Sequence, residues 1–192
     1  KRKLRMGMVG GGQGAFIGAV HRIAAAMDQQ IDLCAGCFSR DAENTQITGK
    51  QLYIDSSRCY ESYEEMAEKE SQLPDTERID FVSIVTPNKS HFSIAKRFLE
   101  KGFHIVCDKP MTFNLEEAEE LVKIVEKSGL VFGLTHNYTG NPLVREAREL
   151  FSSGELGVVR KAMVEYLQDF LMYPHEKEGM KQAVWRVDPS QS

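Results

Sequence analysis

Short apolar runs alternate with helix-favouring segments along the first two thirds of the chain. Five near-continuous apolar runs have the length and composition of buried strands, namely residues 6–9, 31–38, 80–85, 103–107 and 130–135. Apolar spacing, glycine stops and possible caps predict helices between them, over residues 17–27, 63–71, 91–101 and 115–128. This alternation predicts an α/β fold with a doubly wound parallel sheet over residues 4–136.

A different pattern follows this region. Residues 143–152 predict a helix, Gly154 and Gly157 predict a turn, and the alternating residues 158–167 predict a strand that opens a second sheet. We therefore expect a first domain over residues 1–137. Residues 138–192 are expected to begin a second, α+β domain with an open mixed or antiparallel sheet.

A glycine-rich turn joins the first predicted strand to the first predicted helix. Gly10, Gly12 and Ala15 fit the G-x-G-x-x-G/A spacing of dinucleotide sites, although Gly14 or Gly18 could supply the third small residue. Such a turn brings backbone N–H groups and the positive end of a helix dipole close to a phosphate. An ordinary strand-to-helix turn is the alternative. The candidate phosphate-binding residues are Gly10, Gly12, Gln13, Gly14, Ala15, Phe16 and Ile17.

The second predicted strand is followed by Ser39, Arg40 and Asp41. In a dinucleotide fold, the end of this strand reads the adenosine ribose. Arg40 can pair with a 2′-phosphate or stack on adenine, so Ser39 and Arg40 favour NADP. A small shift of register would instead make Asp41 the ribose acceptor and favour NAD. Ser39 or Asp41 could also merely cap the next helix.

Polar residues follow the third and fourth predicted strands. Thr86, Pro87 and Asn88 follow the third strand, where Ser90 and His91 open the next helix, and the fourth strand is followed by Asp108, Lys109 and Pro110. The carboxyl ends of parallel strands form the ligand-binding edge of open α/β sheets. The sequence therefore predicts a ligand site there. The alternative for Lys109 is a surface lysine before a turn proline.

Charge and composition argue against nucleic acids and membranes as partners. The net charge is −4 and the basic residues are scattered, which gives no footprint for nucleic acid or an anionic membrane surface. No apolar run approaches the roughly 18 residues of a membrane span, and the first strand is too short for a signal peptide. With 42% hydrophobic and 27% charged residues, the chain has the composition of a globular domain, and we expect it to be cytoplasmic.

The spacing of the cysteines does not favour a metal site. Cys34 and Cys37 form a C-x-x-C pair inside the second predicted strand, where residues three apart point to opposite faces. Cys59 and Cys107 have no partner spacing. We expect free thiols, as in a reducing compartment.

Six segments occur in an order that resembles the Gfo/Idh/MocA oxidoreductases, NAD(P)-dependent Rossmann enzymes that act mostly on sugars and polyols. The segments are VGGGQGAFIGAVHR (9–22), SIVTPNKSH (83–91), DKPMT (108–112), THNYTGNP (135–142), GELG (154–157) and WR (185–186). The resemblance implies that Lys109 is catalytic and bridges the nicotinamide ribose and the substrate hydroxyl. An ammonium there stabilises the alkoxide that develops as hydride leaves the carbinol carbon. Asp108 stands where the family has Glu.

The resemblance also implies further cofactor contacts. These residues are Thr86, Pro87, Asn88, His91, Asp108, Pro110, Asn137, Trp185 and Arg186. His136 and Tyr138 belong to the same strand-end segment as Asn137. His21 also matches the family, with a packing or capping role beneath the phosphate loop as the alternative.

The resemblance implies NADP or NAD as cofactor, a sugar- or polyol-like substrate, and a homo-oligomer, either a dimer or a tetramer. Family members supply a further Asp and His beyond the point where Ser192 stands here, so we expect this chain to bind the dinucleotide but turn over poorly. A non-catalytic dinucleotide-binding sensor is the alternative function. Transient oxidation that drives elimination or glycoside cleavage is a third.

Overall fold

The computed structural model describes the chain except for residues 1, 168, 170–171, 178, 185–186 and 191–192. The chain divides into two compact units, Lys1–Thr135 and His136–Ser192. The first unit contains the parallel sheet, and the described part of the second consists of helices and segments without regular structure.

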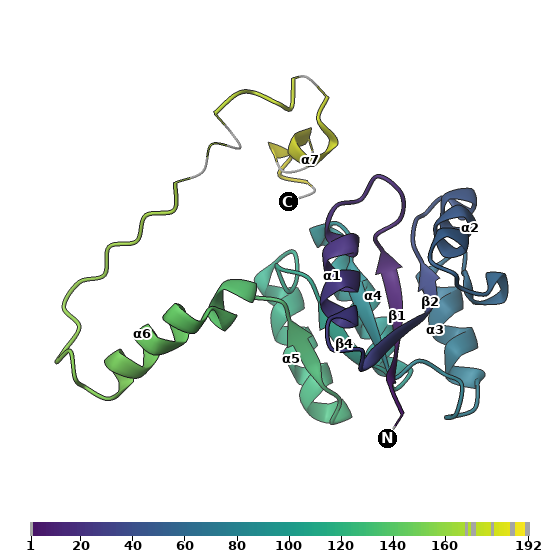
Figure 1. The fold of residues 1–192 in the computed structure, drawn as a ribbon, viewed down its shortest axis with the longest axis horizontal. Coiled ribbons are helices and arrows are strands. Elements are labelled where there is room, and N and C mark those ends of the chain that lie inside the picture. Colours follow the sequence, from purple (N-terminus) through teal and green to yellow (C-terminus); the bar gives the residue numbers. More distant parts are fainter. Residues whose placement is uncertain (1, 168, 170–171, 178, 185–186, 191–192) are drawn as a thin grey trace. The chain divides into compact units, whose positions relative to one another are not determined.

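Five parallel strands form one sheet in the first unit (Figure 1). They are β1 (Leu4–Gly10), β2 (Ile31–Cys37), β3 (Phe81–Val85), β4 (His104–Cys107) and β5 (Phe132–Leu134). Their order is β2-β1-β3-β4-β5, and every neighbouring pair is parallel. The predicted doubly wound sheet is thereby confirmed. The chain moves from β1 to β2 and then crosses back to β3, so its direction of winding reverses between β1 and β3.

The predicted helices are found within one residue of their expected ends. They are α1 (Ile17–Ala26), α3 (Tyr63–Gln72), α4 (His91–Glu100) and α5 (Leu115–Ser128). The side chain of Ser62 caps α3 by accepting from Glu65 N–H, and that of Asn114 caps α5 by accepting from the N–H of Glu117. In the described residues, no helix is both long and apolar enough to cross a membrane.

The sequence pattern does not predict the helix α2 (Ala42–Gln51). Asp41 caps it by accepting a hydrogen bond from Glu43 N–H at 3.0 Å. The helix buries Thr45, Thr48 and Gly49, with no large apolar side chain among its buried residues. Hydrophobic periodicity therefore gives no signal for this helix.

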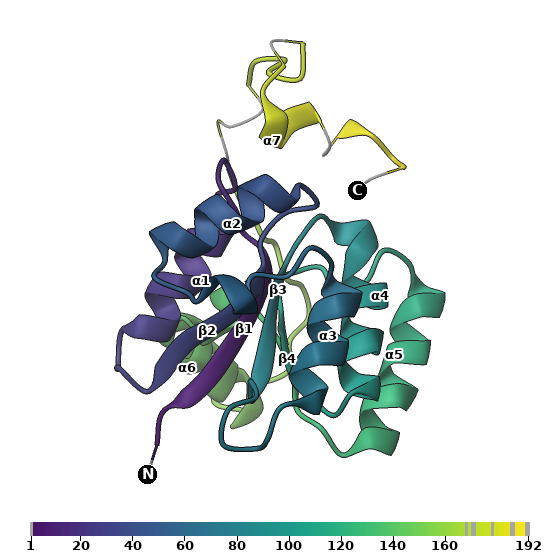
Figure 2. The same cartoon turned by 90° about the vertical axis from the view of Figure 1, so that its right-hand side faces the viewer.

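Two apolar clusters cover the two faces of the sheet. Helices α3, α4 and α5 lie on one face, where Met66, Phe98 and Leu121 pack against β-strand residues such as Ile84 (Figure 2). Helix α1 covers the other face, and Ile17 belongs to the cluster on that side. The sheet is therefore a fixed platform between two helical layers, which holds its carboxyl-end loops in place.

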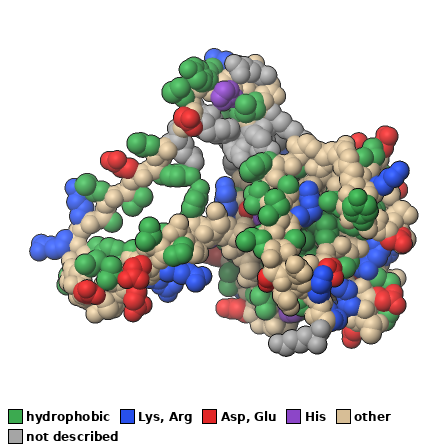
Figure 3. All heavy atoms as spheres, in the orientation of Figure 1, with side chains coloured by type: hydrophobic (Ala, Val, Ile, Leu, Met, Phe, Trp, Pro, Cys, Tyr) green, Lys and Arg blue, Asp and Glu red, His purple; other side chains and the backbone are tan. Residues whose placement is uncertain are grey.

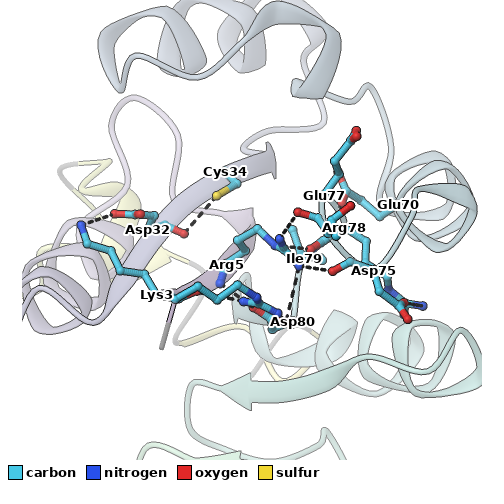
Figure 4. A network of polar contacts seen from close by, with 12 residues as sticks. Lys3, Arg5, Asp32, Cys34, Glu70, Asp75, Glu77, Arg78, Ile79 and Asp80 are labelled. Atoms are coloured by element: carbon cyan, nitrogen blue, oxygen red, sulfur yellow. Dashed lines mark hydrogen bonds and ion pairs between the residues drawn. The ribbon is translucent and has the colours of Figure 1, made fainter.

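Glu70 of α3 is fully buried beside the amino-terminal end of β3 (Figure 4). Its carboxylate accepts hydrogen bonds from the Arg58 guanidinium at 2.6–2.9 Å, from the Tyr60 hydroxyl at 2.7 Å and from Ile79 N–H at 3.1 Å. Burial of the Tyr60 side chain, together with its bond to Glu70, raises the pKa of the phenol well above its usual value. A buried charge with this many partners is a structural anchor.

Asp80 forms a second polar anchor just before β3 (Figure 4). Its two carboxylate oxygens each lie 2.7 Å from a nitrogen of the Arg2 guanidinium, and Oδ2 also accepts from the backbone N–H of Arg5 at 2.7 Å. These contacts tie the start of β1 to the start of β3. They lie at the opposite end of the strands from the glycine-rich turn.

The second unit contains α6 (Pro142–Ser152) and α7 (Lys181–Val184). The strand predicted over residues 158–167 is wrong: no regular structure is assigned there. A strand exists only through hydrogen bonds to a neighbouring strand, and the described part of this unit contains no other strand to pair with. Its apolar side chains, such as Val158, Val164 and Leu167, are consequently exposed. Figure 3 shows hydrophobic side chains on the surface of this part of the chain.

Candidate functional site

The loops that follow β1 and β3 meet at the point where the winding of the sheet reverses. Gly10, the last residue of β1, pairs in register with Val85, the last residue of β3. Ligands of open α/β sheets bind in the crevice outside the carboxyl ends of the strands at such a point. The structure therefore brings the glycine-rich turn and the loop beginning at Thr86 to one edge of the sheet.

Close backbone packing explains most of the glycines in the turn. A Cβ on Gly10, which has a φ of 88°, would lie 2.8 Å from Val85 O, and a Cβ on Gly12 would lie 2.8 Å from Phe38 O. A Cβ on Gly18 would lie only 2.4 Å from the Cα of Gly11. Gly18, which the sequence left as an alternative to Ala15, thus allows α1 to approach the turn.

Gly14 differs from the other glycines because it faces open space. It has a φ of 77°, and a Cβ added there would meet no atom within 4 Å. Phe16 is the N-cap residue of α1 and forms no side-chain cap, and no acceptor for the backbone N–H groups of Gly14 and Phe16 is found among the described residues. Uncapped N–H groups at a helix start, beside an open glycine, fit the pyrophosphate of a dinucleotide.

Two side chains of α2, those of Asn44 and Thr48, accept hydrogen bonds from the backbone of the glycine-rich turn. Gln13 N–H lies 3.1 Å from Asn44 Oδ1 and 3.2 Å from Thr48 Oγ1, and Thr48 in turn donates to Asn44 at 3.1 Å. The Gln13 N–H therefore stabilises the conformation of the loop. The sequence reasoning missed Asn44 and Thr48 because no helix was expected there.

The end of β2 supplies the candidate ribose-reading residues. Asp41 caps α2, and its backbone N–H donates to the Ser39 hydroxyl at 3.1 Å. Arg40 is exposed and makes no hydrogen bond or ion pair with the described residues. The capping alternative for Asp41 is thus confirmed, and the Arg40 guanidinium is available to a ligand.

The loop after β3 is held by side-chain contacts of its own. The Ser90 hydroxyl lies 2.8 Å from both Thr86 Oγ1 and Pro87 O. Asn88 begins a short 3-10 turn, Asn88–Ser90, that leads into α4. Thr86, Pro87 and Asn88 therefore form a compact turn next to the glycine-rich loop.

His91, the first residue of α4, is buried, with 1% of its surface exposed. Its Nε2 lies 2.8 Å from Thr86 O and its Nδ1 lies 2.7 Å from Pro110 O. The ring thus touches the loops after β3 and β4 at the same time. Each ring nitrogen faces a backbone carbonyl oxygen, so the neutral ring donates to one of the two and the imidazolium form donates to both.

Lys109 is exposed and its ammonium has no partner among the described residues, whereas its neighbours are anchored. Asp108 N–H donates to Ile84 O at 2.9 Å, and Asp108 Oδ1 accepts from the Thr135 hydroxyl at 2.9 Å. The Lys109–Pro110 peptide bond is cis. The structure therefore presents a free amine from a fixed backbone at the carboxyl edge of the sheet.

The pKa of Asp108 reflects opposing influences. Burial raises it, but contacts with His21, with the Thr135 hydroxyl and with Lys109 N–H outweigh burial and hold the pKa below its usual range. His21 Nε2 lies 3.8 Å from Asp108 Oδ1, and His21 Nδ1 lies 3.0 Å from the Ser83 hydroxyl. Asp108 is thus a stable anion beside Lys109.

Three candidate residues do not belong to the first unit. Asn137 belongs to the second unit, in the short turn Asn137–Gly140, together with Tyr138, whose hydroxyl lies 2.6 Å from that of Tyr166. Trp185 and Arg186 lie outside the described residues.

The thiols take no part in the site. Burial raises the pKa values of Cys37 and Cys107 to about 12, so both are protonated. All four cysteines are free, as predicted. The described residues hold no group of three or more His, Cys, Asp or Glu that could bind a metal.

Comparisons with known proteins agree with this geometry. A family model described as "Oxidoreductase family, NAD-binding Rossmann fold" (GFO_IDH_MocA) matches residues 4–136. The uncharacterized oxidoreductase YfiI of Bacillus subtilis is 36% identical over 190 residues, which are 98% of this chain and 48% of that protein.

Two solved structures from Azotobacter vinelandii are also similar. An inositol dehydrogenase homolog complexed with NAD+ is 40% identical with a TM-score of 0.92, over 98% of this chain and 48% of that one. An inositol dehydrogenase homolog complexed with NADH and myo-inositol is 43% identical with a TM-score of 0.79, over 83% of this chain and 41% of that one.

The chain spans just under half the length of these relatives. The family model covers well over half of the chain and ends where the first unit ends, within one residue. The chain therefore belongs to the Gfo/Idh/MocA family of oxidoreductases, and its first unit is the family's NAD-binding Rossmann fold.

Proposed function

We propose that this protein is an NAD(P)-dependent dehydrogenase that transfers a hydride between the nicotinamide and a hydroxyl-bearing carbon of a sugar or polyol. The observation that carries the proposal is Lys109, a free ammonium presented at the cofactor edge of a sheet with an open phosphate loop. The myo-inositol in one solved relative supports a polyol as the class of substrate.

Each part of the edge has a distinct role in this proposal. The N–H groups of Gly14 and Phe16 bind the pyrophosphate, and the turn 86–88 lies along the ribose on the nicotinamide side. The dinucleotide, when bound, supplies the hydride acceptor or donor. Lys109 places its ammonium near the substrate oxygen, where it stabilises negative charge and passes a proton. Asp108 remains ionised and keeps that region favourable for a cation.

We further propose that NADP is the preferred cofactor. The exposed Arg40 guanidinium suits a 2′-phosphate, and Asp41 already uses a carboxylate oxygen to cap α2. Calorimetric titration should give a lower Kd for NADP than for NAD. The Arg40→Ala variant should weaken NADP binding about tenfold or more and leave NAD nearly unchanged, whereas the exposed-arginine control Arg160→Ala should change neither. Tighter binding of NAD by the unmodified protein would overturn this preference.

The catalytic proposal is tested by Lys109→Ala beside Lys127→Ala, a control at an exposed lysine of α5. Turnover is measured with a panel of polyols and sugars that includes myo-inositol, and Kd for the dinucleotide is measured in parallel. Lys109→Ala should lower turnover about 10²- to 10⁴-fold while Kd changes by no more than about threefold. Full activity in this variant would remove Lys109 from catalysis. Tight cofactor binding together with a residual turnover that Lys109→Ala does not lower would favour the sensor alternative.

A further inference from the structure

The backbone ladder between β3 and β4 is interrupted at Pro110. Asp108 N–H donates to Ile84 O at 2.9 Å just beyond the paired ends of the two strands. In a parallel ladder the next bond would run from the nitrogen of residue 110 to Thr86 O, two residues further along each chain. Proline has no N–H, so this bond cannot form.

The His91 ring stands at this break. Its Nε2 faces Thr86 O at 2.8 Å, the acceptor that the proline leaves without a donor, and its Nδ1 faces Pro110 O at 2.7 Å. Both contacts are partly buried, and the ring itself is only 1% exposed. The ring therefore joins the two loops where the backbone no longer does, and it donates to both carbonyls in its imidazolium form.

We propose that His91 is a positioning residue, whose imidazole replaces the missing ladder bond and holds the Lys109–Pro110 segment at a fixed distance from the Thr86–Asn88 turn. The proposal rests on the proposed function, because it assigns the direction of the Lys109 side chain to this contact. His91 is buried and both of its nitrogens face backbone, so it acts through Lys109 and touches neither substrate nor cofactor.

The two ring nitrogens reach different loops, and this permits a selective test. An asparagine amide occupies the place of Nδ1 and can still donate to Pro110 O, whereas a glutamine amide reaches the place of Nε2 and can still donate to Thr86 O. His91→Asn therefore keeps the contact with the lysine loop, and His91→Gln keeps only the contact with the turn after β3. His104→Gln, at the exposed start of β4, is the matched control.

The first measurement uses the protein without cofactor. Backbone order parameters from NMR should fall at Lys109 and Met111 in His91→Gln, from about 0.85 towards 0.6, and stay unchanged in His91→Asn. The reverse is expected at Asn88 and Lys89, which should loosen in His91→Asn only. His104→Gln should change neither pair. Equal order parameters in both His91 variants would overturn the proposal and leave His91 a packing residue.

The second measurement separates positioning from binding. His91→Gln should lower kcat about 10- to 100-fold while KM and the Kd for the dinucleotide stay within about threefold, and His91→Asn should restore kcat to within about threefold of the unmodified protein. Equal losses of kcat in the two variants would contradict the proposal. Failure of the unmodified protein to bind a dinucleotide would instead refute the proposed function, and the order parameters would still decide the role of His91.

Discussion

The Thr135 hydroxyl donates to Asp108 Oδ1 at 2.9 Å and so joins the carboxyl ends of β5 and β4. Thr135 N–H also donates to Cys107 O at 2.9 Å, which places the threonine firmly against the strand that carries Asp108. Lys109 is thus preceded by a residue fixed through its side chain and followed by one fixed through its carbonyl. A flexible amine carried by a rigid backbone suits a residue that must contact a bound substrate.

The Thr135→Val variant should raise the pKa of Asp108. Valine keeps the shape of threonine but removes the hydroxyl that helps to hold this pKa low, so the carboxylate loses a stabilising partner. Carboxyl chemical shifts followed by NMR from pH 7 to pH 2 measure the change. Thr139→Val, which removes a hydroxyl bond to His136 O, is the control and should leave the Asp108 titration unchanged.

The same variant makes a prediction about stability and pH. The folded-state pKa of Asp108 lies below its unfolded value, so this carboxylate stabilises the fold above about pH 4 and ceases to do so as the pH falls through the folded pKa. Thr135→Val should cost about 1 kcal/mol at pH 7, and this difference should shrink at acid pH. A difference that is the same at pH 7 and pH 3 would show that the bond does not depend on the charge of Asp108.

Local signals predicted the first unit well because each one has a direct physical cause. Ser62 caps α3, and Gly129, with a φ of 67°, ends α5. Serine is a preferred residue at a helix start and glycine at a helix end, so the sequence alone indicates both positions. The apolar runs locate every strand of the sheet because parallel strands are buried on both faces.

The failures also have physical causes. Helix α2 buries threonines and a glycine, so its sequence looks like a loop. The alternation of residues 158–167 predicts a strand, but strand formation requires a partner that local sequence does not specify. The contact of His91 with Pro110 O spans 19 positions and depends on how β4 lies beside β3, which no local pattern encodes.

Gly18→Ala should destabilise the fold and weaken cofactor binding. Its new Cβ would lie 2.4 Å from the Cα of Gly11. Because the Gly11 Cα is backbone and a Cβ cannot rotate away from it, α1 has to move away from the turn. Overpacking of this kind costs about 1–3 kcal/mol. Urea unfolding and dinucleotide titration measure the two effects.

Gly140→Ala is the matched control for this substitution. A Cβ there meets no atom within 4 Å, and Gly140 is not among the glycines with positive φ. Its unfolding free energy should change by no more than about 0.5 kcal/mol. If Gly18→Ala were as stable as Gly140→Ala, the close approach of α1 to the turn would not be required.

Glu70→Gln should be among the most destabilising single changes at the amino-terminal edge of the sheet. It leaves the Arg58 guanidinium beside a neutral amide. The amide NH2 replaces either Oε1, which accepts from Tyr60, or Oε2, which accepts from Ile79, so one of these donors then faces another donor. Loss of one partner from a buried ion pair costs about 3–5 kcal/mol. The control Glu68→Gln, at a partly exposed carboxylate of α3 that pairs with Lys101, should have a much smaller effect. Chemical unfolding of both variants tests the comparison.

Asp80→Asn should lower stability at neutral pH and lose that effect in acid. The side-chain hydrogen bond from Arg2, followed by the bond from Arg5 N–H and the positive charges of both arginines, holds the pKa of Asp80 below its usual range, and these contributions exceed the opposing effect of burial. A carboxyl whose folded pKa is depressed stabilises the fold above its unfolded pKa of about 3.9, and this stabilisation is lost as the pH falls through the folded value.

Urea midpoints of the variant and the unmodified protein should therefore differ at pH 7 and converge towards pH 2–3. Asp32→Asn, which removes only an exposed ion pair with Lys3, should shift the midpoint far less at pH 7. Equal midpoints for Asp80→Asn and the unmodified protein at pH 7 would mean that the link between the starts of β1 and β3 does not depend on this charge.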